Sequence, residues 1–188
     1  IMKQKIGDRK IIWLIKQILN NTAEFKKEAD NLSIKKGMPL GNFTSQFFAN
    51  VYLNELDYFV KHKMKIKYYL RYVDDFVILD GSKERLEKWK LEIDKFLKNE
   101  LRIELHPQKS NIIPISKGID FVGFRNYYYF RTPRKRTIKK MFNKVEMYKN
   151  RKITKEKLLE IFQGWQAYAK WSETYNLRKK VVKYIYAL

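Results

Sequence analysis

The sequence predicts an α+β fold followed by a purely helical segment, and three observations support this. Hydrophobic residues make up 45% of the 188 residues, enough to form a sizeable core. Two short runs of aromatic and β-branched residues, 68–70 and 76–79, are typical of neighbouring strands joined by a tight turn. From residue 132 onward, apolar residues recur at helical spacing. Helices packed on antiparallel hairpins make an α+β arrangement.

Three helices are expected in the first hundred residues. Asp8 is positioned to cap the first, whose apolar face contains Ile11, Leu14, Ile15, Ile18 and Leu19. A Gly- and Pro-punctuated turn, residues 37–41, precedes the second helix, which Thr44 or Ser45 can cap. Gly81 and Ser82 open the third. The inward faces of the last two are predicted to be Phe48, Val51, Tyr52, Leu56, Phe59 and Val60, and Leu86, Trp89, Ile93, Phe96 and Leu97.

Further strands are expected at residues 101–105, 112–115, 119–124 and 127–130, with a turn at Asn126. Three helical faces follow, formed by Ile138, Met141, Phe142 and Val145, then Leu158, Leu159, Phe162 and Trp165, then Leu177, Val181, Val182 and Ile185. Pro133 lies at the junction between the two patterns. We therefore predict a first domain over residues 1–131 and a helical domain over residues 132–188.

The charge balance indicates a polyanionic partner. Lysine and arginine number 41 against 20 acids, a formal net charge of +21. Residues 131–157 carry 12 basic residues but only two acids, among interleaved aromatic residues that offer stacking surfaces. Contacts with duplex phosphates are expected from Arg134, Lys135, Arg136, Lys139 and Lys140. No apolar run is long enough to cross a membrane, so no membrane partner and a cytoplasmic location are expected.

Asp74 and Asp75 are adjacent carboxylates at the tip of the first predicted hairpin. Like charges at this spacing repel unless a positive group lies against them, and hard oxygen ligands suit Mg²⁺ or Mn²⁺. A solvated turn is the alternative interpretation. A metal-dependent nuclease is a further alternative, although such enzymes usually gather more acids and often a histidine or lysine near the metals. With no cysteine and only two histidines, a thiolate site is excluded and a zinc enzyme is not expected.

Four motifs follow one another along the chain: Gly37-x-Pro39-x-Gly41-x-x-x-Ser45, Tyr72-Val73-Asp74-Asp75, a following Lys109, and Phe121-Val122-Gly123-Phe124. Their order and spacing resemble the palm of a reverse transcriptase. The resemblance implies a metal-binding hairpin at Asp74 and Asp75, and a primer grip at Phe121, Val122, Gly123 and Phe124. Lys109 would donate a proton to the departing pyrophosphate or steady its charge as a cation. Nucleotide or template contacts would come from Gly37, Pro39, Leu40, Gly41, Asn42, Ser45, Gln46 and Tyr72, and the helical tail would be the thumb.

This resemblance implies template-primed cDNA synthesis by two-metal chemistry. The implied partners are an RNA template, a DNA or RNA primer and deoxynucleoside triphosphates. The first motif ends in Ser45-Gln46, which resembles the reverse transcriptases of diversity-generating retroelements, enzymes that copy a template RNA mutagenically and typically use a small basic accessory protein. Group II intron, retron and phage-defence enzymes are alternatives, as is a catalytically silent nucleic-acid-binding module of polymerase shape.

A third metal-binding aspartate, which the family places on a strand before the palm helices, has no counterpart in this sequence. Upstream of Gly37 the acids are Asp8, Glu24, Glu28 and Asp30, and none follows an apolar strand. The fingers segment is not recognisable either. We therefore expect an N-terminally truncated fragment that binds duplex but does not extend a primer by itself, because two acids from one turn supply too few ligands for two ions.

Overall fold

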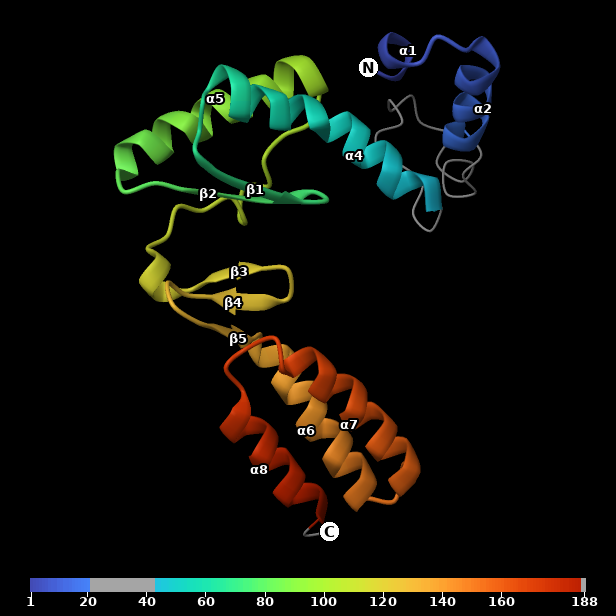
Figure 1. Cartoon of the computed structure of the whole chain (residues 1–188), viewed down its shortest axis with the longest axis vertical. Coiled ribbons are helices and arrows are strands. Elements are labelled where there is room, and N and C mark those ends of the chain that lie inside the picture. The colour runs from blue at the N-terminus through green and yellow to red at the C-terminus, as the bar shows by residue number, and fades with distance from the viewer. Residues whose placement is uncertain (21–42, 187–188) are drawn as a thin grey trace. The chain divides into compact units, whose positions relative to one another are not determined.

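The computed structural model describes residues 1–20 and 43–186, which fall into two compact units, residues 1–112 and 113–188 (Figure 1). The division between the units comes before the domain boundary predicted at residues 131 and 132. The small second sheet therefore groups with the C-terminal helices. The separation into palm and thumb is a functional division and stays a prediction.

Unit 1 combines helices with one hairpin. Its elements are α1 (Met2–Lys5), α2 (Arg9–Asn20), α4 (Phe43–Tyr58), a π-helical turn η1 (Phe59–Lys63), β1 (Tyr68–Tyr72), β2 (Asp75–Leu79) and α5 (Lys83–Leu101). The core lies between α4, α5 and the hairpin, and its buried members are Leu56, Val60, Ile66, Ile93, Leu97 and Leu101. Phe59 and Phe96 stack at 4.1 Å between ring centroids. The inward faces predicted for both helices are confirmed.

The helix starts follow the predicted chemistry in two of three places. Asp8 Oδ1 accepts hydrogen bonds from the backbone N–H groups of Lys10 and Ile11. Ser82 Oγ accepts one from Arg85 at the start of α5. The helix α4 already begins at Phe43, so Thr44 and Ser45 lie in its first turn and not at a preceding cap.

The strand predicted over residues 101–105 is wrong. Leu101 is the last residue of α5, and Arg102 follows in the left-handed conformation with φ 50°. Leu101 and Leu105 still contribute to the core of unit 1, which explains their apolar alternation without a strand.

Unit 2 starts with a 3₁₀ turn η2 (Ile115–Lys117) and a meander of β3 (Ile119–Phe121), β4 (Phe124–Asn126) and β5 (Arg131–Pro133). Both pairings are antiparallel. The strand predictions for this region need correction. Residues 112–115 and 127–130 do not form strands, and a turn at Val122–Gly123 divides the strand predicted over residues 119–124. Asn126 does not form a turn but lies within β4, where it pairs with Ile119 and Arg131, and the chain reverses after it in the loop 127–130.

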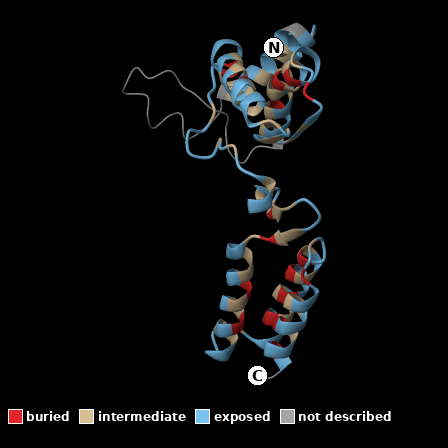
Figure 2. Cartoon of the chain, turned by 90° about the vertical axis from the view of Figure 1, so that its left-hand side faces the viewer, coloured by how far each residue is buried: buried red, intermediate tan, exposed pale blue. Residues whose placement is uncertain are grey.

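Three helices complete unit 2: α6 (Lys135–Lys149), α7 (Lys155–Ala169) and α8 (Tyr175–Tyr186). Figure 2 shows their buried residues in red along the inward faces. That core consists of Met141, Val145, Leu158, Phe162, Trp165, Ala169, Val181 and Ile185, which confirms the three predicted helical faces. Across the described ranges, the helices are all too short or too polar to cross a membrane.

Candidate active site

The hairpin β1–β2 places the two adjacent acids at an exposed tip. Tyr72 pairs with Asp75, so Val73 and Asp74 form the turn. Val73 has φ 56°, a left-handed conformation that a β-branched residue rarely adopts. Both Asp74 and Asp75 are exposed to solvent. The predicted acidic hairpin is therefore present, with its carboxylates free to meet a cation from outside.

The two faces of this hairpin differ sharply. Tyr69, Phe76 and Ile78 pack against the core of unit 1. On the opposite face, Tyr68, Leu70 and Tyr72 are 57%, 60% and 59% exposed. Alternation along a strand sends successive side chains to opposite faces, so this exposed apolar face ends at the acidic tip. Tyr72, predicted to contact the nucleotide or the template, lies on this face.

Arg71 fixes the acidic turn to helix α4. Its Nη1 donates hydrogen bonds to the Val73 carbonyl at 2.7 Å and to Asn50 Oδ1 at 3.0 Å. Its Nε donates to Asp57 Oδ1 at 2.7 Å, and its Nη2 pairs with the other carboxylate oxygen. The side chain is only 11% exposed. A guanidinium that binds a carboxylate with two groups has a fixed orientation, so Arg71 holds the turn in register with the helix.

Electrostatics reinforce this arrangement. Burial alone would raise the pKa of Asp57, but hydrogen bonds from Arg71 and Tyr69 and the nearby guanidinium charge hold that pKa below its usual value. Burial and the hydrogen bond to Asp57 together raise the pKa of Tyr69. None of these three residues was predicted from the sequence to support the acidic turn. The available signal was a pair of polar groups, Tyr69 and Arg71, on the inward-facing positions of an otherwise apolar strand.

The acidic tip fits a divalent cation in ligand chemistry but supplies few ligands. Carboxylate oxygens are suitable for Mg²⁺ or Mn²⁺. Within residues 1–20 and 43–186, there is no group of three or more acidic, histidine or cysteine side chains that could hold a metal ion. Asp57 is committed to Arg71 and Tyr69. Among the described acids, Asp74 and Asp75 are thus the ones at this turn that could bind a divalent cation.

The other predicted nucleotide contacts are only partly described. Gly37, Pro39, Leu40, Gly41 and Asn42 lie outside the described residues. Ser45 and Gln46 lie in the first turn of α4, and Gln46 is exposed. Lys109 is an exposed residue in a turn closed by hydrogen bonds from the Lys109 and Ser110 N–H groups to the His106 carbonyl. No described hydrogen bond or ion pair joins Lys109 to the acidic tip, so its catalytic role stays a prediction.

The predicted primer-grip motif forms the turn between β3 and β4. Val122 and Gly123 both have positive φ, 45° and 83°, as a type I′ hairpin turn requires. The Tyr168 hydroxyl donates a 2.6 Å hydrogen bond to the Gly123 carbonyl. A Cβ on Gly123 would lie 3.1 Å from that hydroxyl. The positive φ and the close Tyr168 hydroxyl therefore explain the glycine at this position without any contact to a primer.

Phe124 anchors this turn to the helices. Its buried ring stacks on the Tyr168 ring of α7 at 4.6 Å between centroids. The Arg131 guanidinium lies 4.8 Å from the centroid of the Phe124 ring. Phe121 is half-buried and Val122 is exposed. The motif therefore combines a packed ring with an exposed turn, and its contact with a primer stays a prediction.

The predicted duplex-binding residues lie at the start of α6. Lys135, Arg136, Lys139 and Lys140 are exposed. Arg134 differs, because it is the half-buried N-cap residue and its Nε is buried without a hydrogen-bond partner among the described atoms. The first four are accessible to phosphates, whereas Arg134 is partly withdrawn into unit 2.

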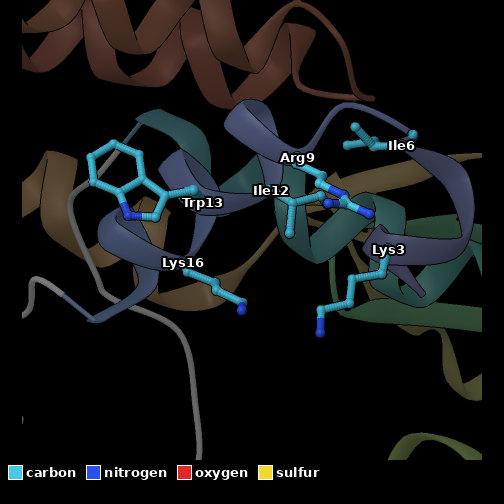
Figure 3. A pocket seen from close by; sticks show the side chains of 7 residues that line it. Lys3, Ile6, Arg9, Ile12, Trp13 and Lys16 are labelled. Atoms are coloured by element: carbon cyan, nitrogen blue, oxygen red, sulfur yellow. The ribbon is translucent and has the colours of Figure 1, made fainter.

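A separate shallow hollow of about 360 Å³ lies on the N-terminal helices (Figure 3). Lys3, Arg9 and Lys16 contribute three cationic groups to it, and Ile6, Ile12 and Trp13 contribute apolar surface. Neither Asp74 nor Asp75 lines this hollow. It contains no acid, histidine or hydroxyl group, so it has no obvious catalytic chemistry.

Comparison with known proteins gives the family. Residues 3–126 match the model of the family described as reverse transcriptase (RNA-dependent DNA polymerase). The group II intron-encoded protein LtrA of Lactococcus lactis subsp. cremoris is 26% identical over 202 residues, and so is the protein of the same name from strain MG1363. Each alignment covers 74% of this chain and 33% of the relative, so the chain spans about a third of their length. Since the family model covers more than half of the residues, including the acidic hairpin, the chain belongs to the reverse transcriptase family.

Proposed function

We propose that this chain forms part of the catalytic core of an RNA-directed DNA polymerase, with its acidic turn at the site of nucleotidyl transfer. The observation that carries the proposal is the exposed Asp74–Asp75 pair on a turn that Arg71 fixes to helix α4. The exposed acid pair makes no contribution to the hydrophobic core of unit 1, so packing does not explain it. A turn held this firmly is suited to presenting carboxylates in one geometry.

In this proposal Asp74 and Asp75 hold Mg²⁺ or Mn²⁺. Two such ions, about 3.5–4 Å apart when bound, would stabilise the charge on the attacking and leaving oxygens. Asp74 is the more direct ligand and Asp75 supports the second position. Tyr72, with its exposed ring beside the tip, borders the end of the primer. Ser45 and Gln46, with residues 37–42, face the entering nucleotide, and Lys109 steadies the departing pyrophosphate.

Unit 2 would hold the template–primer duplex. The Val122–Gly123 turn is the primer grip, and the exposed cations of α6 contact phosphates without reading sequence. Between residues 113 and 188 there are 19 lysines and arginines against five acids. This imbalance supports binding to a polyanion. On this proposal the palm covers residues 1–131 and the thumb residues 132–188, and deoxynucleoside triphosphates are the substrates.

Two kinds of element could encode such an enzyme. The relatives named above are called group II intron-encoded proteins. The Ser45-Gln46 end of the first motif supports a diversity-generating retroelement, in which copying would be mutagenic and a small basic accessory protein would assist. Sequencing cDNA made by the complete enzyme on a defined RNA template separates the two. Errors concentrated at template adenines support the retroelement, and evenly distributed errors contradict it.

A catalytically silent nucleic-acid-binding module is the second candidate, favoured by the net charge of +21. Primer extension separates it from the polymerase. In the complete enzyme, Asp74→Asn should abolish primer extension, by at least about 100-fold, because a metal ligand is lost. Glu100→Gln, a change at an exposed acid of α5, is the control and should leave extension unchanged.

The 188-residue chain alone should bind a template–primer duplex without extending it, since its described part supplies only this acid pair at the turn. Extension that survives Asp74→Asn in the complete enzyme would show that the acidic turn is not the metal site. Absence of extension by the complete wild-type enzyme, with all four deoxynucleotides present, would favour the silent module.

A further inference from the structure

The hairpin β4–β5 ends in two consecutive aromatic residues that nothing in the described part of unit 2 covers. Tyr128 and Tyr129 lie in the middle of its four-residue loop, residues 127–130, and are 71% and 91% exposed. Below them, Tyr127 and Phe130 stack at 4.6 Å between centroids, and the Tyr127 N–H donates a 2.8 Å hydrogen bond to the Phe130 carbonyl. We call residues 127–130 the aromatic tip.

The composition of the aromatic tip is unfavourable for a turn that serves only to reverse the chain. Turns and short loops are usually rich in glycine, proline, asparagine, aspartate and serine. Here the loop holds two large rings, which lie 4.5 Å apart at an interplanar angle of 72°. An edge-to-face pair leaves ring faces open to solvent. Adjacent exposed apolar groups of this kind indicate a binding surface.

The tip is also held in place. The Tyr127–Phe130 stack closes its base, and Arg131, the first residue of β5, donates a hydrogen bond from Nε to the Trp171 carbonyl. The N–H of Glu173 binds the Arg131 carbonyl at 2.9 Å. These contacts join the hairpin to the segment between α7 and α8, so the rings project from an anchored support. A loop backbone held in this way loses little conformational entropy when a ligand stacks on its rings.

The net charge of unit 2 selects the class of partner. In the described part of unit 2, two ion pairs, Lys149–Glu146 and Lys157–Glu160, engage two of the 19 lysines and arginines of this unit. The remaining cations attract phosphates, and ring faces accept bases of any sequence. An apolar protein partner would account for the rings but not for this uncompensated charge. A single-stranded nucleic acid accounts for both observations, because its unpaired bases can stack on the rings and its phosphates can pair with the cations.

We propose that Tyr128 and Tyr129 stack on unpaired bases of a single-stranded nucleic acid. The inference deepens the proposed function, because a polymerase that copies RNA must hold single-stranded template next to the duplex. Its ligand class is any RNA or DNA strand with accessible bases, and sequence preference should be weak. The contact is additional to the duplex contacts proposed for α6 and is carried by rings instead of charges.

The test measures binding of the full 188-residue chain to fluorescent 12-nucleotide strands, one of ordinary oligodeoxyadenylate and one with abasic sites throughout. The wild type should prefer the base-containing strand. The double variant Tyr128→Ala, Tyr129→Ala should lose affinity for that strand by about fivefold or more, on the scale of one stacked base. Its affinity for the abasic strand should not change, because the phosphate contacts are intact.

Two further measurements separate stacking from charge. The slope of log affinity against log salt should be equal in wild type and double variant, whereas changing Lys135, Arg136 and Lys139 to Gln should flatten it. The fluorescence of 2-aminopurine in the strand should respond to the wild type and to Tyr128→Phe, Tyr129→Phe, which keeps both rings, but not to the alanine pair. The control Tyr175→Ala, Tyr186→Ala removes two other exposed tyrosines of unit 2, 68% and 77% exposed, and should match the wild type.

Undiminished affinity of the alanine pair for the base-containing strand would overturn the proposal, and so would an equal loss on both strands. These binding results do not depend on polymerisation. Failure of the complete enzyme to extend a primer would count against the proposed function, while the comparison of the two strands would still decide the role of the aromatic tip.

Discussion

In both hairpins, β1–β2 and β3–β4, a distant side chain holds a turn that starts with a valine in the left-handed region, but the chemistry of the two anchoring side chains differs. Each turn starts with a valine in the left-handed region, Val73 at φ 56° and Val122 at φ 45°. Each has a turn carbonyl that accepts a hydrogen bond from a distant side chain, Arg71 in the first hairpin and Tyr168 in the second. In one turn the residue after valine is an acid, and in the other it is a glycine.

The difference follows from what each turn presents. The first exposes two carboxylates, whose mutual repulsion would loosen it, so its anchor is a cation tied to a second acid, Asp57. The second turn carries no charge, and its anchor is a neutral hydroxyl supported by stacked rings. The acidic turn thus has a charged anchoring residue, and the uncharged turn has a neutral one. This comparison predicts different responses to mutation and to pH.

Removing the charged anchor should have the largest effect. Arg71→Met leaves Asp57 half-buried without its cation and frees the Val73 carbonyl, so we expect unit 1 to lose about 2–3 kcal/mol of unfolding free energy. Urea unfolding should be followed by hydrogen exchange in peptides from residues 44–79. A local readout is needed because the chain has two units and a global transition need not be two-state.

The matched control is Arg85→Met, which removes the ion pair with Asp80 from a side chain that is 62% exposed. Exposed pairs contribute little, so its cost should stay below about 1 kcal/mol. In the complete enzyme, Arg71→Met should also slow primer extension, because the acidic turn is released. Equal stability losses in the two variants would show that Arg71 does not anchor the turn.

The charged anchor should respond to acid. The pKa of Asp57 is lowered in the folded protein, so its stabilising contribution is present above its ordinary value of 3.8 and is lost as pH falls through the folded pKa. The stability difference between wild type and Asp57→Asn should therefore be constant near neutral pH and shrink below about pH 4. Urea unfolding of both proteins from pH 3 to pH 7 measures this. A difference that grows in acid would contradict the assignment.

The sequence predicted the acidic hairpin, the helical faces and the basic surface, because each depends on local periodicity or charge. It did not predict the anchors. Arg71 reaches Asp57 and Asn50 across the fold, and Tyr168 reaches Gly123, so their roles depend on tertiary contacts between distant residues. The turn positions were predicted wrongly for a different reason. Val122, Tyr128 and Tyr129 are residue types that favour strands, whereas the structure has them in a turn and a loop.

Removing the neutral anchor should cost less and should not depend on acid. Tyr168→Phe keeps the ring stacked on Phe124 but deletes the hydrogen bond to the Gly123 carbonyl, a loss of about 1 kcal/mol. Because neither partner is charged in acid, the difference from wild type should be the same at pH 3 and pH 7. Tyr175→Phe, at an exposed position, is the control and should be neutral. A pH-dependent difference would remove the distinction between the two anchors.

Relieving the strained valine should have the smallest effect, with the opposite sign. At φ 45°, Val122 suffers a steric clash that glycine avoids, and the cost of a non-glycine residue in this region is about 1–2 kcal/mol. The greater backbone entropy that glycine loses on folding offsets roughly 0.5–1 kcal/mol of this gain in stability. Val122 is 43% exposed, so little burial is forfeited. Val122→Gly should therefore stabilise unit 2 by up to about 1 kcal/mol, measured by hydrogen exchange in peptides from residues 113–135. Val77→Gly, in the ordinary strand conformation of β2, should instead destabilise unit 1. If Val122→Gly destabilised unit 2 as well, the exposed valine would have to contribute more through its side chain than its backbone strain costs.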